Sequence, residues 1–148
     1  MYREKIEELI KWKKEDRKNI LIIKGAPRTG KTWLLKEFGE KYYEKIIYIS
    51  FKQDYKNNND EKVSDIKEII TKKENVNIIE DIKKILKIKE ESNVEYLIIL
   101  DDIENSENAV NNLKYLFSRN KQIDIIASTS KYGISLPESI KFPNNKVK

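Results

Sequence analysis

The chain carries the sequence KNILIIKGAPRTGKTWLLKEF at residues 18–38, and this stretch decides the fold. Its apolar run Ile20–Ile23 has the length and composition of a strand that is buried on both faces of a sheet. The motif G-x-x-x-x-G-K-[ST] follows at Gly25–Thr32, and a pattern of helical spacing begins within it at Lys31. A glycine-rich loop between a buried strand and the first turn of a helix is typical of a phosphate-binding P-loop.

The residue types of this loop suit a nucleoside triphosphate, which we expect to be ATP with Mg²⁺. Gly25 and Gly30 permit the tight backbone that lets amide groups point at phosphate oxygens, and the helix dipole favours an anion there. Lys31 is predicted to reach the β- and γ-phosphates, and the Thr32 hydroxyl is predicted to ligate Mg²⁺. The residues predicted to bind the nucleotide are Gly25, Ala26, Pro27, Arg28, Thr29, Gly30, Lys31, Thr32 and Trp33.

Outside the P-loop, strand-like apolar runs alternate with amphipathic helical patterns. Strands are predicted at residues 20–23, 45–51, 96–100 and 123–127, with a further candidate at 139–142. Helices are predicted over residues 1–18, 31–43, 63–70, 78–86 and 106–118, and a polar surface loop over 52–62. Such alternation favours an α/β fold, a three-layer αβα sandwich of the P-loop NTPase class with a mostly parallel central sheet.

The apolar strand predicted at 96–100 ends in two carboxylates, Asp101 and Asp102. Ligands of parallel α/β sheets bind beyond the carboxyl ends of the strands, so both carboxylates are expected near the P-loop. We predict that Asp101 holds Mg²⁺ opposite Thr32, as a Walker B aspartate does. Asp102 is a candidate for polarising the attacking water, and the alternative is that it caps the next helix.

Three hydroxyl residues, Ser128, Thr129 and Ser130, follow the strand predicted at 123–127. A hydroxyl there can contact the γ-phosphate or orient water, which is the sensor-1 role, and Ser128 is the candidate for it. An ordinary polar turn accounts for the same residues. Neither Arg28 in the P-loop nor Arg119 near a predicted helix end is identifiable as an arginine finger from the sequence.

The composition excludes several kinds of chemistry. The 148 residues include no Cys and no His, which removes disulfides, thiolate zinc sites, cysteine nucleophiles and Ser–His–Asp triads. The net charge is +5, but Lys is interspersed with Asp and Glu, so a nucleic-acid partner is unsupported. No stretch approaches the roughly 20 apolar residues of a membrane span, and the N-terminus lacks a signal-peptide core. We therefore expect a cytoplasmic protein without a membrane partner.

Four segments together resemble the AAA domain of prokaryotic ATPases: KNILIIKGAPRTGKTWLLKEF, KIIYISF, YLIILDDIE and IDIIASTSKYG. The resemblance implies Walker A roles for Lys31 and Thr32, the Walker B role for Asp101 and the sensor-1 position for Ser128. It also implies that residues 1–148 form a single AAA core domain, without the lid and C-terminal domain that follow it in the family. Self-association or a partner protein would then supply an arginine finger.

The chain departs from the family pattern at three positions. Asp102 stands where the family usually has Glu, Thr129 where it often has Gly, and Pro27 where it commonly has Arg. The missing Glu matters most, because small misplacements of a catalytic group are costly.

Three functional hypotheses follow. The first is an ATPase that binds Mg·ATP and hydrolyses it slowly, with Lys31, Asp102 and Ser128 as its catalytic residues. The second is a nucleotide-binding switch with little or no hydrolysis. The third is a small P-loop phosphotransferase, which ranks last because the sequence contains no acceptor-binding motif.

Overall fold

The computed structural model describes residues 2–14, 20–24, 30–52, 61–116 and 122–130. Four parallel strands form one sheet in the order β1-β4-β3-β2. The predicted α/β fold with a parallel central sheet is therefore confirmed. The elements in chain order are α1 (Tyr2–Lys13), β1 (Leu21–Lys24), α2 (Lys31–Tyr42), β2 (Lys45–Ser50), α3 (Glu61–Ile70), α4 (Ile78–Leu86), β3 (Tyr96–Asp101), the 3₁₀ helix η1 (Ile103–Asn105), α5 (Glu107–Asn112), the 3₁₀ helix η2 (Leu113–Tyr115) and β4 (Ile123–Thr129).

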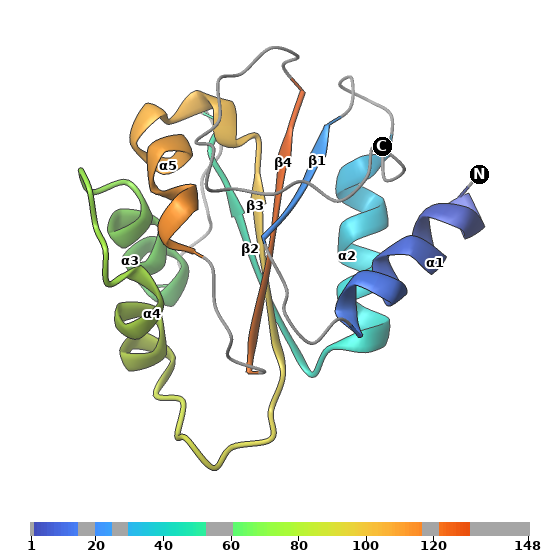
Figure 1. Ribbon diagram of the computed structural model, residues 1–148, viewed down its shortest axis with the longest axis horizontal. Coiled ribbons are helices and arrows are strands. Elements are labelled where there is room, and N and C mark those ends of the chain that lie inside the picture. Colours follow the sequence, from blue (N-terminus) through green and yellow to red (C-terminus); the bar gives the residue numbers. More distant parts are fainter. Residues whose placement is uncertain (1, 15–19, 25–29, 53–60, 117–121, 131–148) are drawn as a thin grey trace.

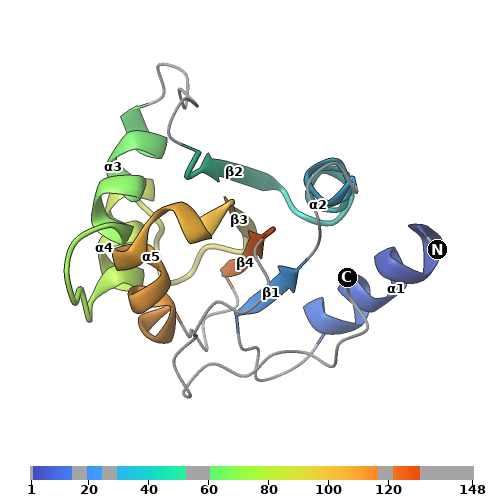
Figure 2. The same cartoon turned by 90° about the horizontal axis from the view of Figure 1, so that it is seen from above.

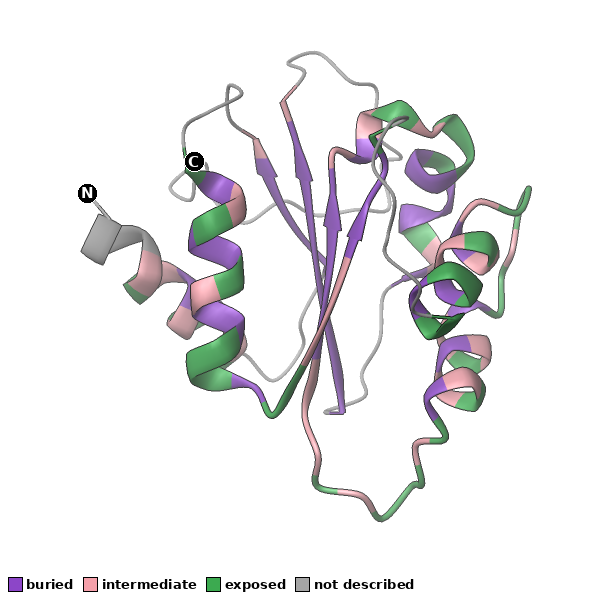
Figure 3. Ribbon diagram, turned by 180° about the vertical axis from the view of Figure 1, so that it is seen from behind, coloured by how far each residue is buried: buried purple, intermediate pink, exposed green. Residues whose placement is uncertain are grey.

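Helices cover both faces of the sheet, with α1 and α2 on one face and α3, α4 and α5 on the other (Figures 1 and 2). Alternate strand residues feed two apolar clusters, since successive side chains of a strand point to opposite faces. On β3, Leu97 and Ile99 pack with α1 and α2, whereas Ile98 and Leu100 pack with α3, α4 and α5. The strands are accordingly buried over most of their length, and the outer sides of the helices are exposed (Figure 3).

The helix predicted over residues 106–118 was too long. The structure has α5 over Glu107–Asn112 and the separate turn η2 over Leu113–Tyr115. Asn112 is fully buried, and its side-chain amide donates hydrogen bonds to the backbone carbonyls of Ile70 at 2.8 Å and Lys72 at 2.5 Å. The helix therefore changes geometry where Asn112 binds the end of α3, a long-range contact that periodicity does not encode.

Two other predicted boundaries also differ. The fourth strand extends through Thr129, because Ser128 and Thr129 pair in register with β1. The surface loop predicted over 52–62 is interrupted by α3, which already begins at Glu61. The strand candidate at 139–142 lies outside the described residues.

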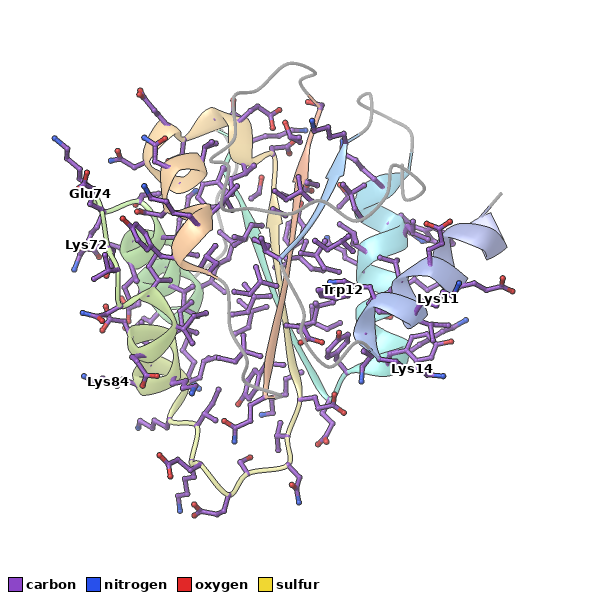
Figure 4. The ribbon with its side chains drawn as sticks, in the orientation of Figure 1. Lys11, Trp12, Lys14, Lys72, Glu74 and Lys84 are labelled. Carbon is purple, nitrogen blue, oxygen red and sulfur yellow. The ribbon has the colours of Figure 1, made fainter. Side chains whose placement is uncertain are left out.

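The N-terminal helix lies against α2 and covers the edge of the sheet. Leu9 and Trp12 are buried in the cluster with α2, and Lys11 and Lys14 are exposed. Figure 4 shows Trp12 on the side of α1 that faces the sheet. Within the described ranges, none of the helices has the length and apolar character that crossing a membrane requires.

A polar cluster holds the amino-terminal edge of the sheet together beneath this helix. The buried Tyr43 hydroxyl donates a hydrogen bond to the Asp124 carboxylate. Lys13 binds Glu95 at 2.7 Å and lies 4.9 Å from the centre of the Tyr43 ring. Burial, and next the negative charge of Asp124, raise the pKa of the Tyr43 phenol far above its usual value.

We expect Tyr43→Phe to lower the free energy of unfolding by about 1.5–3 kcal/mol at neutral pH, the range for a hydrogen bond to a charged group. A group whose pKa is raised by folding stabilises fully below its unfolded pKa, here about 10, and this stabilisation is lost as the pH rises further. The variant should therefore lose less stability than the wild type above about pH 10, as measured by urea unfolding. The control is Tyr42→Phe, on an adjacent exposed ring. If the free energy of unfolding fell equally in wild type and Tyr43→Phe at alkaline pH, the assigned hydrogen bond from Tyr43 to Asp124 would be contradicted.

Candidate functional site

The P-loop ends at the amino terminus of α2. Gly30 has a φ of 83°, in the left-handed region, and a Cβ added there would meet no atom within 4 Å. The requirement for glycine is therefore one of backbone conformation and not of space. Lys31 opens α2 and is only 8% exposed, whereas Trp33 is 61% exposed. The other predicted nucleotide-binding residues, at positions 25–29, lie outside the described residues.

The Asp101 carboxylate lies at the centre of the site and accepts hydrogen bonds on both oxygens. The Thr32 hydroxyl donates to Oδ2 at 2.7 Å, and the Tyr48 hydroxyl donates to the same oxygen at 2.5 Å. The Ser128 hydroxyl donates to Oδ1, which also accepts from the backbone N–H of Asp102 at 3.1 Å. The structure thus brings together Thr32, Asp101 and Ser128, which the sequence placed in three separate motifs.

Strand geometry explains why these groups meet. Asp101 follows Leu97 and Ile99 at intervals of two residues, so its side chain points to the same face of the sheet, the one covered by α2. Ser128 has the same relation to Ile126 on β4, the neighbouring strand. The helix that carries Thr32 packs on that face. All the carboxyl ends of the parallel strands lie together, at the top of Figure 1.

The surroundings of Asp101 favour its ionised form. Burial alone would raise the pKa of this carboxyl group. Hydrogen bonds from Ser128, Tyr48 and Thr32, in that order of size, act in the opposite direction. Together with the positive charge of Lys31 they hold the pKa of Asp101 below its usual value. A carboxylate that stays ionised beside a buried lysine is suited to a cation and a polyphosphate.

Tyr48 is a site residue that sequence reasoning missed. It pairs in register with Ile99 on β3, two residues short of Asp101, and the Lys36 ammonium lies 4.1 Å from its ring centre. Its hydroxyl reaches Asp101 diagonally across the strands. The available signal was a tyrosine within the apolar run KIIYISF, but its use depends on which strand lies beside β2.

We expect Tyr48→Phe to lower the free energy of unfolding by about 1–2 kcal/mol at pH 7, because a donor to an ionised group is lost. A carboxylate whose pKa is lowered by folding stabilises above its unfolded pKa of about 3.9, and this contribution is lost as the pH falls through the folded value. The difference from wild type should therefore shrink in acid. Urea unfolding at neutral and acidic pH measures it, with Tyr115→Phe on the other face as control. If the difference in unfolding free energy between wild type and Tyr48→Phe did not change with pH, the role of the ionised Asp101 carboxylate as the acceptor would be contradicted.

Asp102 turns the chain immediately after β3. Its φ of 56° and ψ of 45° are left-handed, a conformation that Asp tolerates better than most residues. Its backbone N–H also lies 3.3 Å from the Ser128 hydroxyl, and its carbonyl accepts from the Asn105 N–H at 3.2 Å. Burial, and next the charge of Asp101, raise the pKa of the Asp102 carboxyl above its usual value.

The alternative that the Asp102 side chain caps the following helix is wrong. Within the described part of the chain, its carboxylate makes no capping hydrogen bond to η1. The cap of α5 is Ser106, whose hydroxyl accepts a hydrogen bond from the Ala109 N–H at 3.2 Å. The Asp102 carboxylate, half-buried, is thus not occupied by a helix terminus.

Glu104, on η1, is a third carboxylate at this edge, which sequence reasoning missed. Its Oε2 accepts a hydrogen bond from the Ser130 hydroxyl at 2.8 Å. Burial alone would raise the pKa of Glu104, but hydrogen bonding, first from the Ser130 hydroxyl and next from the backbone N–H of Glu104, outweighs burial and lowers the pKa. The signal in the sequence was the acid at the end of DDIE after the strand. The hydroxyl run at the end of β4 is therefore not a plain polar turn: the Ser128 hydroxyl donates to Asp101, and the Ser130 hydroxyl donates to Glu104.

The chemistry of the donor set fits Mg²⁺. The Thr32 hydroxyl and the Asp101 carboxylate are hard oxygen ligands 2.7 Å apart, which is the pair that the P-loop mode of Mg²⁺ binding uses. Across the described ranges, no group of three or more acidic residues can hold a metal by itself. Phosphate oxygens and water are the further hard ligands that Mg²⁺ uses in sites of this kind.

Comparison with known protein families matches residues 17–148 to an AAA domain. The matched range contains the P-loop, all four strands and every site residue described above. No curated protein matches the chain.

Proposed function

Because the chain belongs to the AAA domain family of P-loop ATPase domains, we propose that it binds ATP with Mg²⁺ and hydrolyses the nucleotide slowly. One observation above all supports the proposal. The Thr32 hydroxyl and the ionised Asp101 carboxylate lie 2.7 Å apart at the carboxyl ends of the strands, beside the buried Lys31. A hydroxyl, an ionised carboxylate and a lysine are the groups that P-loop proteins use to bind Mg²⁺ and the phosphates.

In the proposed complex the triphosphate lies at the amino terminus of α2. Lys31 contacts the β- and γ-phosphates, and the backbone amides of residues 29–32 bind the phosphate oxygens. Thr32 and Asp101 hold Mg²⁺, which supplies positive charge to the same two phosphates. Tyr48 and Ser128 keep the Asp101 carboxylate in place by their hydrogen bonds.

Hydrolysis requires a water molecule in line with the γ-phosphorus. The water oxygen forms the new bond to phosphorus, the bond to the β–γ bridging oxygen breaks, and ADP and phosphate leave with release of one proton. Orientation of this water by a carboxylate is typically worth about 10²–10⁴-fold. Asp102 is the carboxylate at the position of the family's Glu, and Glu104 lies two residues beyond it.

The alternative function is a nucleotide switch that binds without appreciable hydrolysis. The observation that favours it is Asp102 itself, whose carboxylate is one methylene shorter than that of Glu. Calorimetric titration with ATP, with and without Mg²⁺, tests binding, and single-turnover release of labelled phosphate tests hydrolysis. Binding with slow release supports the ATPase, and binding without release supports the switch. Absence of ATP binding overturns both, and phosphate transfer to an acceptor indicates a phosphotransferase.

We also propose that an arginine supplied by a second copy of the chain or by a partner protein raises the rate. Such an arginine is worth about 10³–10⁵-fold in related nucleotide hydrolases. With a second copy as the source, the rate per chain should rise with protein concentration. A rate independent of concentration would leave only a different partner protein as the source.

A further inference from the structure

Asp101 and Glu104, at the carboxyl-terminal edge of the sheet, each accept a hydrogen bond from a serine at the end of β4 or directly after it. The Ser128 hydroxyl donates to Asp101, and two residues further on the Ser130 hydroxyl donates to Glu104 at 2.8 Å. The Ser130 backbone N–H approaches the same Glu104 oxygen at 3.5 Å. Between the two acids, the left-handed turn at Asp102 redirects the chain into η1. Glu104 is thus fixed at the edge of the sheet that carries Asp101.

The second oxygen of Glu104, Oε1, is left without a hydrogen-bond partner among the described residues by this arrangement. Oε1 is buried, and it accepts no hydrogen bond from any residue that the structure describes. Buried polar atoms normally have partners, so an exception next to a binding site calls for a ligand or a water molecule. The only comparable oxygen in the described ranges is Oε2 of Glu37, whose carboxylate lies 4.0 Å from Lys41 on α2.

Asp102 is the less suitable of the two carboxylates for orienting water. Its backbone is held in a left-handed turn, and its side chain is shorter than that of the glutamate usual at this position. Glu104 has the longer side chain, and a hydroxyl group anchors one of its oxygens while the other is buried without a hydrogen-bond partner in the described part of the chain. A catalytic group needs both a fixed position and a free acceptor.

We propose that Glu104, positioned by Ser130, accepts a hydrogen bond from the water that attacks the γ-phosphate, and so performs the task of the glutamate that is missing after Asp101. This inference rests on the proposed ATPase function. The water oxygen bonds to the γ-phosphorus as the bond to the bridging oxygen of ADP breaks. The proton of the water passes by way of the Glu104 carboxylate to phosphate or solvent, so that the carboxylate is regenerated.

The test compares Glu104→Gln with Glu107→Gln, which removes the same charge from an exposed side chain in the first turn of α5. The Gln side-chain oxygen can still accept from Ser130, so the fold is expected to survive, and urea unfolding checks this. Under single-turnover conditions Glu104→Gln should lower the rate by about 10²-fold or more, while Glu107→Gln should leave it at the wild-type value. Affinity for a non-hydrolysable ATP analogue with Mg²⁺, measured by calorimetry, should be that of the wild type in both variants.

A second readout does not depend on turnover. ADP with aluminium fluoride and Mg²⁺ imitates the transition state together with its attacking water, so Glu104→Gln should weaken its binding while leaving the ATP analogue unaffected. Ser130→Ala, which removes the anchor but keeps the carboxylate, should give an intermediate rate and an unchanged affinity for the analogue.

The outcomes separate this inference from the function on which it rests. Wild type that fails to bind Mg·ATP would overturn the proposed function itself. Wild type that binds and hydrolyses ATP, with a Glu104→Gln variant equally fast, would overturn only the role of Glu104. The role of Glu104 would also be overturned if a further variant, Asp102→Asn, abolished hydrolysis and the binding of the aluminium fluoride complex while Glu104→Gln did not.

Discussion

Lys31→Ala is expected to lower the affinity for Mg·ATP by about 10²–10³-fold, the equivalent of losing one partner of a buried ion pair. The lysine is only 8% exposed and opens the helix at which the phosphates are proposed to bind. Its removal leaves phosphate charge without a partner in a place where water screens poorly. Because Ala favours a helix, α2 itself should persist.

Calorimetry at a fixed Mg²⁺ concentration measures this loss. The matched control is Lys41→Ala, which removes the same charge from the last turn of the same helix, where the side chain is 62% exposed. The control should bind Mg·ATP as the wild type does. If Lys31→Ala keeps wild-type affinity, the assignment of a P-loop function to this chain is wrong.

Asp101→Asn is expected to lower the contribution of Mg²⁺ to ATP binding by about 10–100-fold, as the loss of groups that position a metal does elsewhere. Binding without Mg²⁺ should change much less, because the phosphates themselves contact Lys31 and the loop. The neutral amide lacks the charge that holds a hard cation. It can still accept from some of the hydroxyl donors, and the others can rotate, so the variant should fold.

The measurement is the ratio of ATP affinities with and without Mg²⁺, taken for wild type and variant. Asp65→Asn, on the exposed side of α3, loses the same charge and should leave the ratio unchanged. Equal losses in the presence and absence of Mg²⁺ would assign Asp101 a structural role instead of a metal-binding one.

Much of the fold follows from local patterns. The runs Ile20–Ile23 and Tyr96–Leu100 are apolar throughout, as strands buried on both faces require, and both are strands in the structure to within a residue at either end. One face of α3 was predicted from the spacing of Val63, Ile66, Ile69 and Ile70. Three of these side chains are buried, and Ile69 is partly buried against the same cluster. Where the prediction was wrong, at the end of α5, the cause was the long-range contact of Asn112 with α3.

The Walker A sequence by itself predicted the place of the proposed phosphate-binding loop and the helix that follows it, and α2 does begin at Lys31. A glycine at position 30 is a local requirement, since its φ of 83° is strained for other residues whatever surrounds them. The location of Asp101 near this loop was likewise predictable, because the carboxyl ends of parallel strands lie at the same edge of the sheet.

Only the tertiary structure decided which groups surround that carboxylate. Tyr48 reaches Asp101 because β2 is the neighbour of β3, and Ser128 and Ser130 reach Asp101 and Glu104 because β4 lies on the other side. Strand order in a sheet depends on how the connecting segments cross and pack, a property of the whole chain and not of any motif. The sequence therefore predicted the residues proposed to bind phosphate, and the strand order β1-β4-β3-β2 determined which hydroxyl groups contact each carboxylate.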